Sequence, residues 1–297
     1  MHPLIYIIIL NYNGWKDTLS CIQSILDQDY HNFKIVIVDN HSTDNSFFEL
    51  TSFITKVDYD KIIIVKSGMN GGFSYGNNVG IRIALDDFEC KFIWILNNDT
   101  IIKQTTLVHL LNHMTSSQKR IGILGSMLLY FNNPDTIQAL GGVFNKWIGI
   151  GKHIGGYQNK ELGKRRNLDL DYVVGASMFV SINFIKDVGL LSEDYFLYYE
   201  DVDWSIAAKN KGWLLDTCID SEVLHKEGAS IGSSSKGINK SLFSDIESMK
   251  SRLILTRKYY KYCLPTVYLG FLLVILNRIS RKQFDRILPI LKLLLSH

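Results

Sequence analysis

Four short runs of apolar residues, separated by stretches with helical spacing, constrain the fold more than any other feature of this chain. The runs are continuous and rich in Ile and Val, which is typical of parallel strands covered on both faces. They are Ile5–Leu10, Lys34–Asp39, Lys61–Val65 and Phe92–Leu96. Between them, Trp15–Leu26 and Gly76–Leu85 show helical patterns. This alternation predicts a doubly wound α/β unit with a mostly parallel sheet flanked by helices.

The rhythm changes after about Ile121. Residues 122–157 contain short β-like runs with many glycines and aromatic residues. A helix is expected over residues 182–189, and another from Glu200 to a glycine stop at Gly212. We expect this half to be mixed α+β and to pack directly on the first half without a linker.

The last part of the chain differs in charge. Residues 236–297 contain 12 Lys and Arg against 3 Asp and Glu, although the net charge of the whole chain is only +3. This segment is also apolar, so a membrane surface is favoured over nucleic acid. Its run Leu264–Leu276 is too short to span a bilayer comfortably and predicts an interfacial anchor, with a core helix as the alternative. The predicted division is a catalytic domain of residues 1–235, with halves 1–120 and 121–235, and a basic helical tail of residues 236–297.

Composition and cysteine usage indicate a cytoplasmic globular protein. The chain is 46% hydrophobic and 21% charged. Its four cysteines are scattered without CxxC spacing, which fits a reducing compartment and argues against a zinc site or a disulfide framework. The first residues lack the basic start and cleavage site of a signal peptide.

A small polar cluster follows each predicted strand. The clusters are Asn11–Gly14, Asp39–Ser46, Ser67–Asn78 and Asn97–Thr100. Any one of them is explained by a turn. In an open α/β sheet, however, ligands bind beyond the carboxyl ends of the strands. Four polar clusters at one edge therefore predict a polar binding surface that is large enough for a nucleotide. The candidate binding residues are Asn11, Asn13, Asp39, Asn40, Ser42, Asn70, Gly71, Gly72, Phe73, Asn77, Asn97 and Asn98.

Two of these clusters indicate how a nucleotide is held. The carboxylate of Asp39 can accept the N3–H of a uracil or thymine ring, with a helix cap as the alternative role. The glycine-rich stretch Asn70–Asn78 opens a helix, so its backbone N–H groups can approach a phosphate or a ribose. It is neither GxGxxG nor a Walker sequence, which argues against a P-loop ATPase.

Asp99 is the candidate metal ligand. Mg²⁺ or Mn²⁺ takes oxygen ligands, and one or two carboxylates with phosphates and water complete the shell. Such a cation neutralises the charge that develops on a departing diphosphate. Because Asn97 and Asn98 are neutral, tight binding would require the nucleotide itself. A plain turn is the alternative.

A second acidic cluster lies among aromatic residues. Its members are Asp194, Glu200, Asp201 and Asp203. A carboxylate among aromatic rings is partly desolvated, which raises its pKa and suits a general base. The alternative is an N-cap for the following helix. Further along, His225 follows a strand-like run and can complete a metal site, although a lone His is more often structural.

Six stretches, taken in order, resemble the family 2 glycosyltransferases with a GT-A fold, especially their rhamnosyltransferase-like branch. They are "IIILNYNGWKDTLSCIQSIL", "IVIVDNHSTDNS", "NGGFSYGNNVGI", "WILNNDT", "VVGASMFVSINFIKDVGLLSEDYFLYYEDVDWSIAAKNKGW" and "VLHKEGAS". Together they cover about residues 5–230. Six such matches in order are specific, whereas one alone is weak.

The resemblance implies roles for the nucleotide side of the site. The loop after the first strand and Asp39 match base-binding positions. "NNDT" stands where the family has its DxD motif, which makes Asp99 the metal ligand. Asn97 departs from the Asp of many members, but this branch often carries the same amide. His225 matches a His that helps to hold the metal in some relatives.

The resemblance also implies the reaction. Glu200–Asp201 matches the family's ED motif, in which Asp201 is the general base, while Glu200 and Trp204 belong to the substrate-binding residues. The chain is expected to transfer a sugar with inversion, best rhamnose from dTDP-rhamnose, to a glycan on a lipid carrier at the cytoplasmic face of the membrane. UDP-linked galactofuranose, glucose or N-acetylglucosamine are alternative donors. A nucleotide-sugar-binding protein without turnover and a nucleotidyltransferase are the rival classes.

Overall fold

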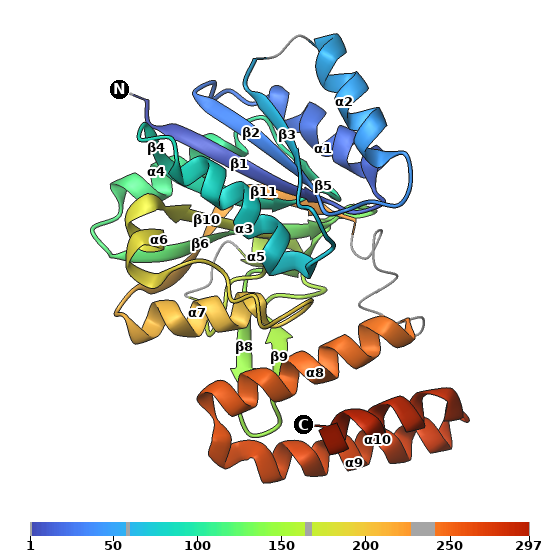
Figure 1. The fold of residues 1–297 in the computed structure, drawn as a ribbon. Helices are drawn as coiled ribbons and strands as arrows, with labels where there is room; N and C mark the ends of the chain where they lie inside the picture. The colour runs from blue at the N-terminus through green and yellow to red at the C-terminus, as the bar shows by residue number, and fades with distance from the viewer. Residues whose placement is uncertain (1, 58–59, 164–167, 227–240, 297) are drawn as a thin grey trace.

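The computed structural model describes residues 2–57, 60–163, 168–226 and 241–296, and within them it contains a nine-stranded sheet and a separate hairpin (Figure 1). The strands of the large sheet are β1 (Leu4–Asn11), β2 (Phe33–Asp39), β3 (Ile62–Lys66), β4 (Cys90–Asn97), β5 (Thr100–Ile102), β6 (Ile121–Tyr130), β7 (Asn133–Ala139), β10 (Ser177–Ser181) and β11 (Leu214–His225). Their order is β3-β2-β1-β4-β10-β6-β11-β5, with β7 paired to β6. The hairpin consists of β8 (Gly142–Asn145) and β9 (Ile150–His153).

The four strands predicted from the apolar runs are parallel neighbours. β1 lies between β2 and β4, and β3 pairs with the outer side of β2. The register places Asn11 opposite Asp39 and Leu10 opposite Asn97. The carboxyl ends of these strands therefore lie at one edge, as their polar termini predict.

Side chains alternate along these strands and fill two cores. Residues such as Ile7 pack with α1 (Trp15–Leu26) and α2 (Ser46–Val57) on one face, and residues such as Ile8 pack with α3 (Gly72–Leu85) on the other. The α3 backbone approaches so closely that a Cβ on Gly80 would lie 2.5 Å from Ile8 Cγ2. The doubly wound α/β prediction is confirmed. α3 begins one turn before the predicted start at Gly76.

The sheet continues without a break into the second half. β10 is antiparallel to both β4 and β6, β11 is parallel to β6, and β5 is antiparallel to β11. The sheet is therefore parallel in its first part and mixed beyond β4, in line with the predicted α+β half. The helices here are α4 (Thr106–Ser116), α5 (Lys160–Gly163), α6 (Ile182–Val188) and α7 (Glu200–Asn210). The stop at Gly212 is confirmed, because its φ of 75° is left-handed.

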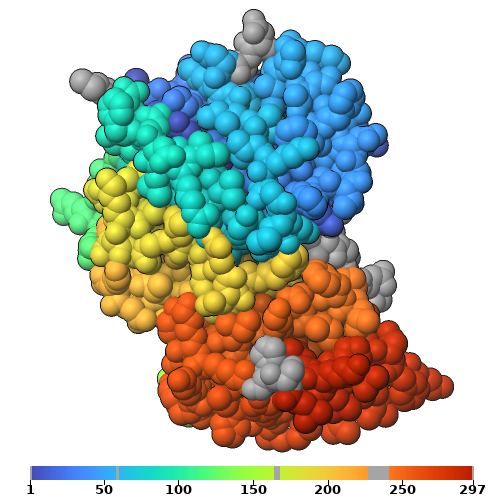
Figure 2. Space-filling view, in the orientation of Figure 1, coloured from blue at the N-terminus to red at the C-terminus, as the bar shows by residue number. Residues whose placement is uncertain are grey.

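The predicted helical tail forms a layer at one end of the molecule (Figure 2). It comprises α8 (Leu242–Tyr259), α9 (Leu264–Ser280) and α10 (Ile287–Ser296), with 3-10 turns η1 (Lys261–Cys263) and η2 (Phe284–Arg286). The three helices share a core of Met249, Leu253, Val267, Phe271, Ile275, Ile290 and Leu293. The predicted boundary between residues 235 and 236 lies outside the described residues.

Helix α8 also packs on the body of the protein. Ser251 Oγ donates a hydrogen bond of 2.8 Å to the carbonyl oxygen of Leu197. Leu255 joins a buried cluster with Tyr172 and Tyr195. Of the tail helices, α8 thus lies between the body and the α9–α10 pair (Figure 1).

Candidate active site

The tips of β1 and β2 are joined by hydrogen bonds between their side chains. Asn11 Nδ2 donates to Asp39 Oδ2 at 2.9 Å and to Ser42 Oγ at 3.1 Å. The backbone N–H of Ser42 donates to Asp39 Oδ1 at 3.0 Å. Each Asp39 oxygen thus accepts one bond and keeps a lone pair for a further donor. The alternative role for Asp39 as a helix cap is wrong, because Asp44 accepts the N–H of Ser46 at the start of α2.

Asn13 organises the loop that follows β2. Its φ of 51° lies in the left-handed region, which Asn tolerates better than most residues. Its Oδ1 accepts the backbone N–H of Thr43 at 2.8 Å, and its own N–H donates to Ser42 Oγ at 3.0 Å. The loops after β1 and β2 therefore form one surface.

The glycine-rich loop after β3 is tied to the same edge. Asn40 Nδ2 donates to Asn70 Oδ1 at 2.9 Å and to the carbonyl oxygen of Gly72 at 3.1 Å. Asn40 is 2% exposed, and its Oδ1 has no hydrogen-bond partner among the described residues. Gly71 lies between these partners and caps α3. Asn77 is buried in the next turn and donates to the Phe73 carbonyl oxygen at 2.9 Å.

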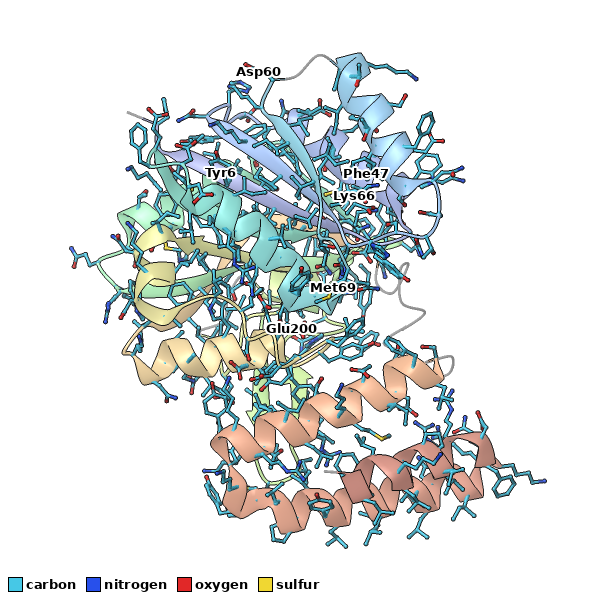
Figure 3. The ribbon with its side chains drawn as sticks, viewed as in Figure 1. Tyr6, Phe47, Asp60, Lys66, Met69 and Glu200 are labelled. Carbon is cyan, nitrogen blue, oxygen red and sulfur yellow. The ribbon has the colours of Figure 1, made fainter. Side chains whose placement is uncertain are left out.

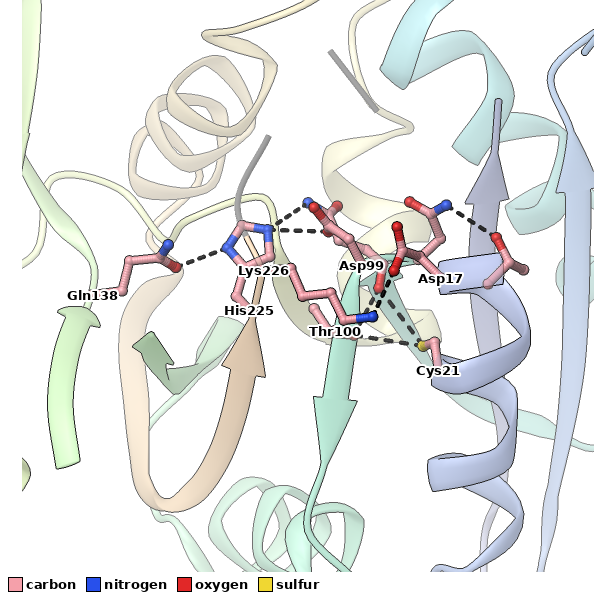
Figure 4. A network of polar contacts seen from close by, with 10 residues as sticks. Asp17, Cys21, Asp99, Thr100, Gln138, His225 and Lys226 are labelled. Carbon is pink, nitrogen blue, oxygen red and sulfur yellow. Dashed lines mark hydrogen bonds and ion pairs between the residues drawn. The ribbon is translucent and has the colours of Figure 1, made fainter. Parts of the chain in front are cut away.

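Beyond β4, the motif Asn97–Thr100 forms a turn into β5, so the turn prediction is also right. The turn brings Asp99 close to His225 of β11 (Figure 4). Asp99 Oδ1 lies 3.2 Å from His225 Nε2, and Asn97 Nδ2 lies 3.4 Å from the same nitrogen. Asn98 instead points to α1, where its Nδ2 donates to Thr18 Oγ1 at 3.0 Å.

Gln138 on β7 orients the imidazole of His225. Its Oε1 lies 2.7 Å from His225 Nδ1, and an amide oxygen can only accept, so Nδ1 carries a hydrogen. In the neutral ring, the lone pair of Nε2 then faces Asp99 Oδ1 with no hydrogen between them. A proton on Nε2 or a metal cation would neutralise this contact. Burial raises the pKa of Asp99, but His225, a backbone N–H and the Lys226 ammonium together lower it, so that its pKa lies below the usual range.

Asp99 and His225 fit a divalent cation that shares its other ligands with a diphosphate and water. A carboxylate oxygen and an imidazole nitrogen are both ligands for Mn²⁺. Among the described residues, no group of three or more His, Cys, Asp or Glu is placed to hold a metal ion. Within the described residues, the protein's share of such a site would thus consist of Asp99 and His225.

The four carboxylates of the second acidic cluster have different surroundings. Asp203 is buried, accepts the Tyr195 hydroxyl at 2.8 Å and pairs with Lys258 Nζ at 2.7 Å. The Asp194 side chain is 65% exposed. Glu200 is buried, and its Oε2 has no hydrogen-bond partner in the described part of the chain. Asp201 accepts the backbone N–H groups of Gly175 at 3.1 Å and of its neighbour Val202 at 2.8 Å.

Burial sets the charge state of Glu200 and Asp201. It raises the pKa of Asp201, and the two backbone N–H donors offset part of this rise. Burial and the nearby charge of Asp201 raise the pKa of Glu200. The N-cap alternative is wrong, because Tyr199 precedes the first turn of α7 and Asp201 lies within it. Asp201 is thus a partly buried carboxylate of raised basicity.

A short chain of contacts connects the two acidic sites. The N–H of Asn97 donates to the carbonyl oxygen of Ala176 at 3.0 Å, and the N–H of the preceding residue, Gly175, donates to Asp201. A Cβ on Gly175 would lie 3.6 Å from Asp201 Cβ and 3.7 Å from Phe73 Cζ. Asp201, Phe73 and the Asn97–Asp99 turn therefore surround one end of the sheet, where Figure 3 also shows Met69 and Glu200.

The prediction for Trp204 is wrong. Its side chain is 1% exposed and packs edge-on against Phe184 at a centroid distance of 5.1 Å. Its indole N–H donates to the Gly189 carbonyl oxygen at 3.0 Å. It points from α7 into the core, where it packs in one buried cluster with Phe184 and Trp213.

Sequence reasoning missed Gln138, Gly175 and Thr18. Gln138 and Gly175 lie in segments without a polar motif, and their partners come from distant strands, so no local signal marks them. Lys226 was also missed, although it directly follows the candidate His225 in the sequence. Its ammonium pairs with Asp17 of α1 beside the Asp99 turn (Figure 4).

Comparison with known proteins places this chain among glycosyltransferases. Residues 6–179 match the family model described as Glycosyl transferase family 2. Over 225 residues the chain is 27% identical to the low-salt glycan biosynthesis hexosyltransferase Agl10 of Haloferax volcanii, covering 74% of this chain and 66% of the relative. Over 231 residues it is 24% identical to the dTDP-rhamnosyl transferase RfbF of Shigella flexneri, covering 77% and 71%. Over 116 residues it is 29% identical to the UDP-Glc:alpha-D-GlcNAc-diphosphoundecaprenol beta-1,3-glucosyltransferase WfaP of Escherichia coli, covering 39% and 43%.

Solved structures show the same fold. GalNAc-T7, crystallised with UDP, GalNAc and Mn²⁺, superposes with a TM-score of 0.68 at 14% identity, over 90% of this chain and 50% of that one. The mannosyltransferase PcManGT of Pyrobaculum calidifontis, in complex with GDP-Man and Mn²⁺, gives a TM-score of 0.57 at 12% identity, over 100% and 87%. The expected GT-A fold, with its added helical tail, is confirmed.

Proposed function

This chain belongs to glycosyl transferase family 2, and we propose that it moves a sugar, with inversion, from a nucleoside diphosphate to a hydroxyl of a glycan acceptor. The observation that carries the proposal is the contact path from Asn97 through Ala176 and Gly175 to Asp201. It brings a candidate cation site and a candidate base to one end of the sheet. Transfer of a sugar from a diphosphate is favoured when the charge on the leaving group is stabilised close to the base that deprotonates the acceptor.

The edge formed by β1, β2 and the glycine-rich loop suits the nucleoside. Asp39 accepts the N3–H of a uracil or thymine ring with its remaining lone pairs, beside Asn11 and Ser42. The orphan Oδ1 of Asn40 supplies an acceptor for a ribose hydroxyl, since a buried carbonyl without a donor is costly unless a ligand satisfies it.

The favoured donor is dTDP-rhamnose. Its support is the likeness to the Shigella flexneri dTDP-rhamnosyl transferase, which extends over most of both chains. UDP-linked galactofuranose, glucose and N-acetylglucosamine are the competing donors, and the likeness to a UDP-glucose-dependent enzyme keeps them open. Base and sugar are tested together by binding assays with dTDP- and UDP-linked sugars.

Asp99 and His225 would hold a divalent cation, Mg²⁺ or Mn²⁺, through a carboxylate oxygen and an imidazole nitrogen. When bound, this cation neutralises charge on the departing diphosphate. Gln138 keeps Nε2 free of hydrogen by accepting from Nδ1. The Asn97 amide lies 3.4 Å from the same Nε2 and stands in place of the carboxylate that many family members carry.

Asp201 acts as the general base. Its carboxylate takes the proton of the acceptor hydroxyl while the hydroxyl oxygen forms a bond to the anomeric carbon and the bond to the diphosphate breaks. One in-line displacement inverts the configuration, and no covalent intermediate with the protein is needed. The raised pKa of Asp201 increases its basicity, which favours proton transfer near neutral pH.

Asp201→Asn tests this role. We expect the variant to keep donor binding and to lose about 10²–10⁴-fold in transfer rate, the usual contribution of a positioned base. Asp194→Asn is the matched control, because it removes a carboxylate from the same segment at an exposed position. In the wild type, transfer should fall as the pH drops through the raised pKa of Asp201, since only the carboxylate accepts a proton. Near-wild-type turnover in Asp201→Asn would remove Asp201 from this role.

The acceptor is proposed to be a lipid-linked glycan at the cytoplasmic face of a membrane, in the synthesis of a cell-surface polysaccharide. The relative WfaP is named for transfer of glucose to a GlcNAc-diphosphoundecaprenol acceptor, which is lipid-linked. If the wild type consumes no donor with a panel of acceptors, yet is stabilised by donor, the rival assignment as a nucleotide-sugar-binding protein is right.

A further inference from the structure

Helices α9 and α10 carry apolar side chains on the side that faces away from their shared core. On α9 the exposed members recur every three or four residues: Leu269, Leu272, Leu273, Leu276 and Ile279. Around α10 the same spacing gives Phe284, Leu288, Leu291 and Leu295. Two stripes with helical period are not scattered surface residues, and adjoining apolar patches of this kind mark an interaction site.

The stripes lie opposite a second, buried set on the same helices. Val267, Phe271 and Ile275 of α9 pack against α8, and Ile290 of α10 joins them. Figure 1 shows α9 and α10 side by side on the far side of α8 from the body, and in Figure 2 they form the end of the molecule. The inner stripes explain how the layer folds, while the outer stripes are left without a partner in the described chain.

The tip of the β8–β9 hairpin continues this surface. Trp147 is 52% exposed, and Ile148 and Ile150 beside it are also exposed. Thr266 of α9 donates its hydroxyl to the Trp147 carbonyl oxygen, and the Tyr262 ring meets the Trp147 ring at 5.8 Å. A Trp–Tyr pair at the border of an apolar surface is typical of the level of lipid headgroups.

Basic side chains surround the apolar stripes. Residues 261–296 contain six Lys and Arg and only one acid, Asp285. Arg278 and Arg286 are used internally, because both pair with buried Asp245. The exposed cations are Lys261, Arg281, Lys282 and Lys292, and the Lys146 ammonium lies over the Trp147 ring. A surface that is apolar in the middle and cationic at its margin is complementary to an anionic bilayer.

We propose that α9, α10 and the tip of the β8–β9 hairpin form a single docking face that lies flat on an anionic membrane. This deepens the proposed function, because it names the surface that brings the enzyme to a lipid-linked acceptor. It extends the face beyond the tail to Trp147, which lies in the predicted catalytic domain.

The flat arrangement follows from the inner stripe. By length and composition, Lys261–Ser280 could cross a membrane. In this structure, however, the guanidinium of buried Arg252 lies 4.5 Å from the centroid of the Phe271 ring, and Arg278 pairs with Asp245. A spanning α9 would have to leave these charged neighbours or take them into hydrocarbon, which is costly. Only the outer stripe is free to enter the acyl boundary.

Trp147 provides the test. The chain has five Trp; Trp94, Trp204 and Trp213 are buried, Trp15 is half-buried, and Trp147 alone is exposed. With vesicles of phosphatidylcholine and phosphatidylglycerol, we expect emission from full-length protein to shift to the blue and to be quenched by brominated lipid. Trp147→Phe should remove most of this response. Vesicles of phosphatidylcholine alone should give much weaker binding.

Matched pairs of variants distinguish binding through the docking face from non-specific binding of exposed apolar side chains to vesicles. Changing Leu272, Leu273 and Leu276 to Ser should lower vesicle partitioning by about 100-fold or more, since each side chain loses its apolar burial. Changing Phe48, Phe88 and Leu162, which are exposed elsewhere, to Ser should leave partitioning unchanged. Changing Arg281, Lys282 and Lys292 to Gln should cost about fivefold per residue and reduce the preference for anionic vesicles.

Several outcomes overturn the proposal. Equal loss of vesicle binding in both triple-Ser variants would do so, as would a stable dimer in which a second copy covers the stripes. Resistance to extraction at high pH would show a spanning helix and contradict the flat arrangement. Transfer to a soluble acceptor, measured without lipid, is independent of this face. Transfer without vesicle binding therefore rejects the docking face alone, and vesicle binding without transfer rejects the proposed function alone.

Discussion

At the scale of single residues, environment rather than residue type separates the carboxylates of this site. Asp203 pairs with Lys258, and the Asp194 side chain is 65% exposed. Asp201 is partly buried and held by backbone N–H groups, which position it without supplying a counter-charge. The surroundings of His225 likewise decide its role. Because Gln138 Oε1 accepts a hydrogen bond from Nδ1, Nε2 is the nitrogen that is left to bind a cation.

Gln138→Leu should therefore weaken cation binding, although Gln138 is not itself a proposed ligand of the cation. We expect a 10–100-fold loss of Mn²⁺ affinity in the presence of nucleoside diphosphate, the usual effect of removing a residue that orients a metal ligand. Electron paramagnetic resonance of free Mn²⁺ measures the affinity, and ¹⁵N shifts of His225 report its tautomer in the metal-free protein.

Two further variants control this experiment. Gln138→Glu keeps an acceptor at the same place and should retain the tautomer. Gln104→Leu makes the same chemical change at an exposed position and should have no effect. Unchanged Mn²⁺ affinity and tautomer in Gln138→Leu would show that Gln138 only fills space.

At the scale of elements, the start of α3 is locked to the segment that leads into α7. The N–H of Phe73 donates to the Phe196 carbonyl oxygen at 2.8 Å, and Gly72 has a φ of 83°. Just beyond Phe196, Tyr198 and Tyr199 both have left-handed φ values, an arrangement that costs energy and persists only where surroundings impose it. The Tyr199 hydroxyl donates to the Gly149 carbonyl oxygen, which helps to hold this conformation.

Gly72→Ala should disrupt both elements. A Cβ there would lie 2.0 Å from the Phe196 carbonyl oxygen, so the segment before Glu200 must move. We expect a loss of ~3 kcal/mol or more of unfolding free energy, from backbone strain and steric overlap together, and weaker donor binding. Calorimetry and donor titration measure these effects.

Gly68→Ala is the matched control. Gly68 has a φ of 87°, but a Cβ there would meet nothing within 4 Å. It should lose only the ~1 kcal/mol of left-handed strain and bind donor normally. Equal losses in the two variants would mean that the contact with Phe196 does not matter.

At the scale of the whole molecule, α8 connects the α9–α10 layer to the site. It reaches the body through Ser251 at Leu197, through Leu255 in the aromatic cluster, and through Lys258 at Asp203. These contacts lie on both sides of Asp201 in sequence. The tail therefore packs against the segment that contains Asp201 and also carries the proposed membrane face.

Lys258→Met should destabilise the whole protein, because it leaves the buried Asp203 carboxylate without its cation. We expect a loss of about 2 kcal/mol in a single unfolding transition, below the usual range for a buried pair since Lys258 is partly exposed. Lys250→Met, on the same helix with a similar exposed fraction, should change stability by less than about 0.5 kcal/mol. Adding Asp203→Asn to Lys258→Met should restore part of the loss, and no restoration would contradict the pairing.

Much of the fold could be predicted from the sequence, because its strongest signals are local. Apolar runs and helical spacing identified the four parallel strands and two of the helices between them, although α2 was not predicted, and polar clusters marked the edge where the strands end. The pairing of Asp99 with His225 was anticipated by resemblance, and the structure places the two in contact. Trp204 was misjudged because a position on a helix does not reveal which way its side chain faces.

The sequence by itself determined which strands form and which of their ends are polar, since periodicity and turn residues act over a few neighbours. Only the tertiary structure decided which side chains meet across the sheet. Gln138 reaches His225, Gly175 reaches Asp201, and Lys258 neutralises Asp203, each across a long separation in the chain. Such contacts depend on strand order and helix docking, which arise from the packing of the whole core rather than from any local pattern.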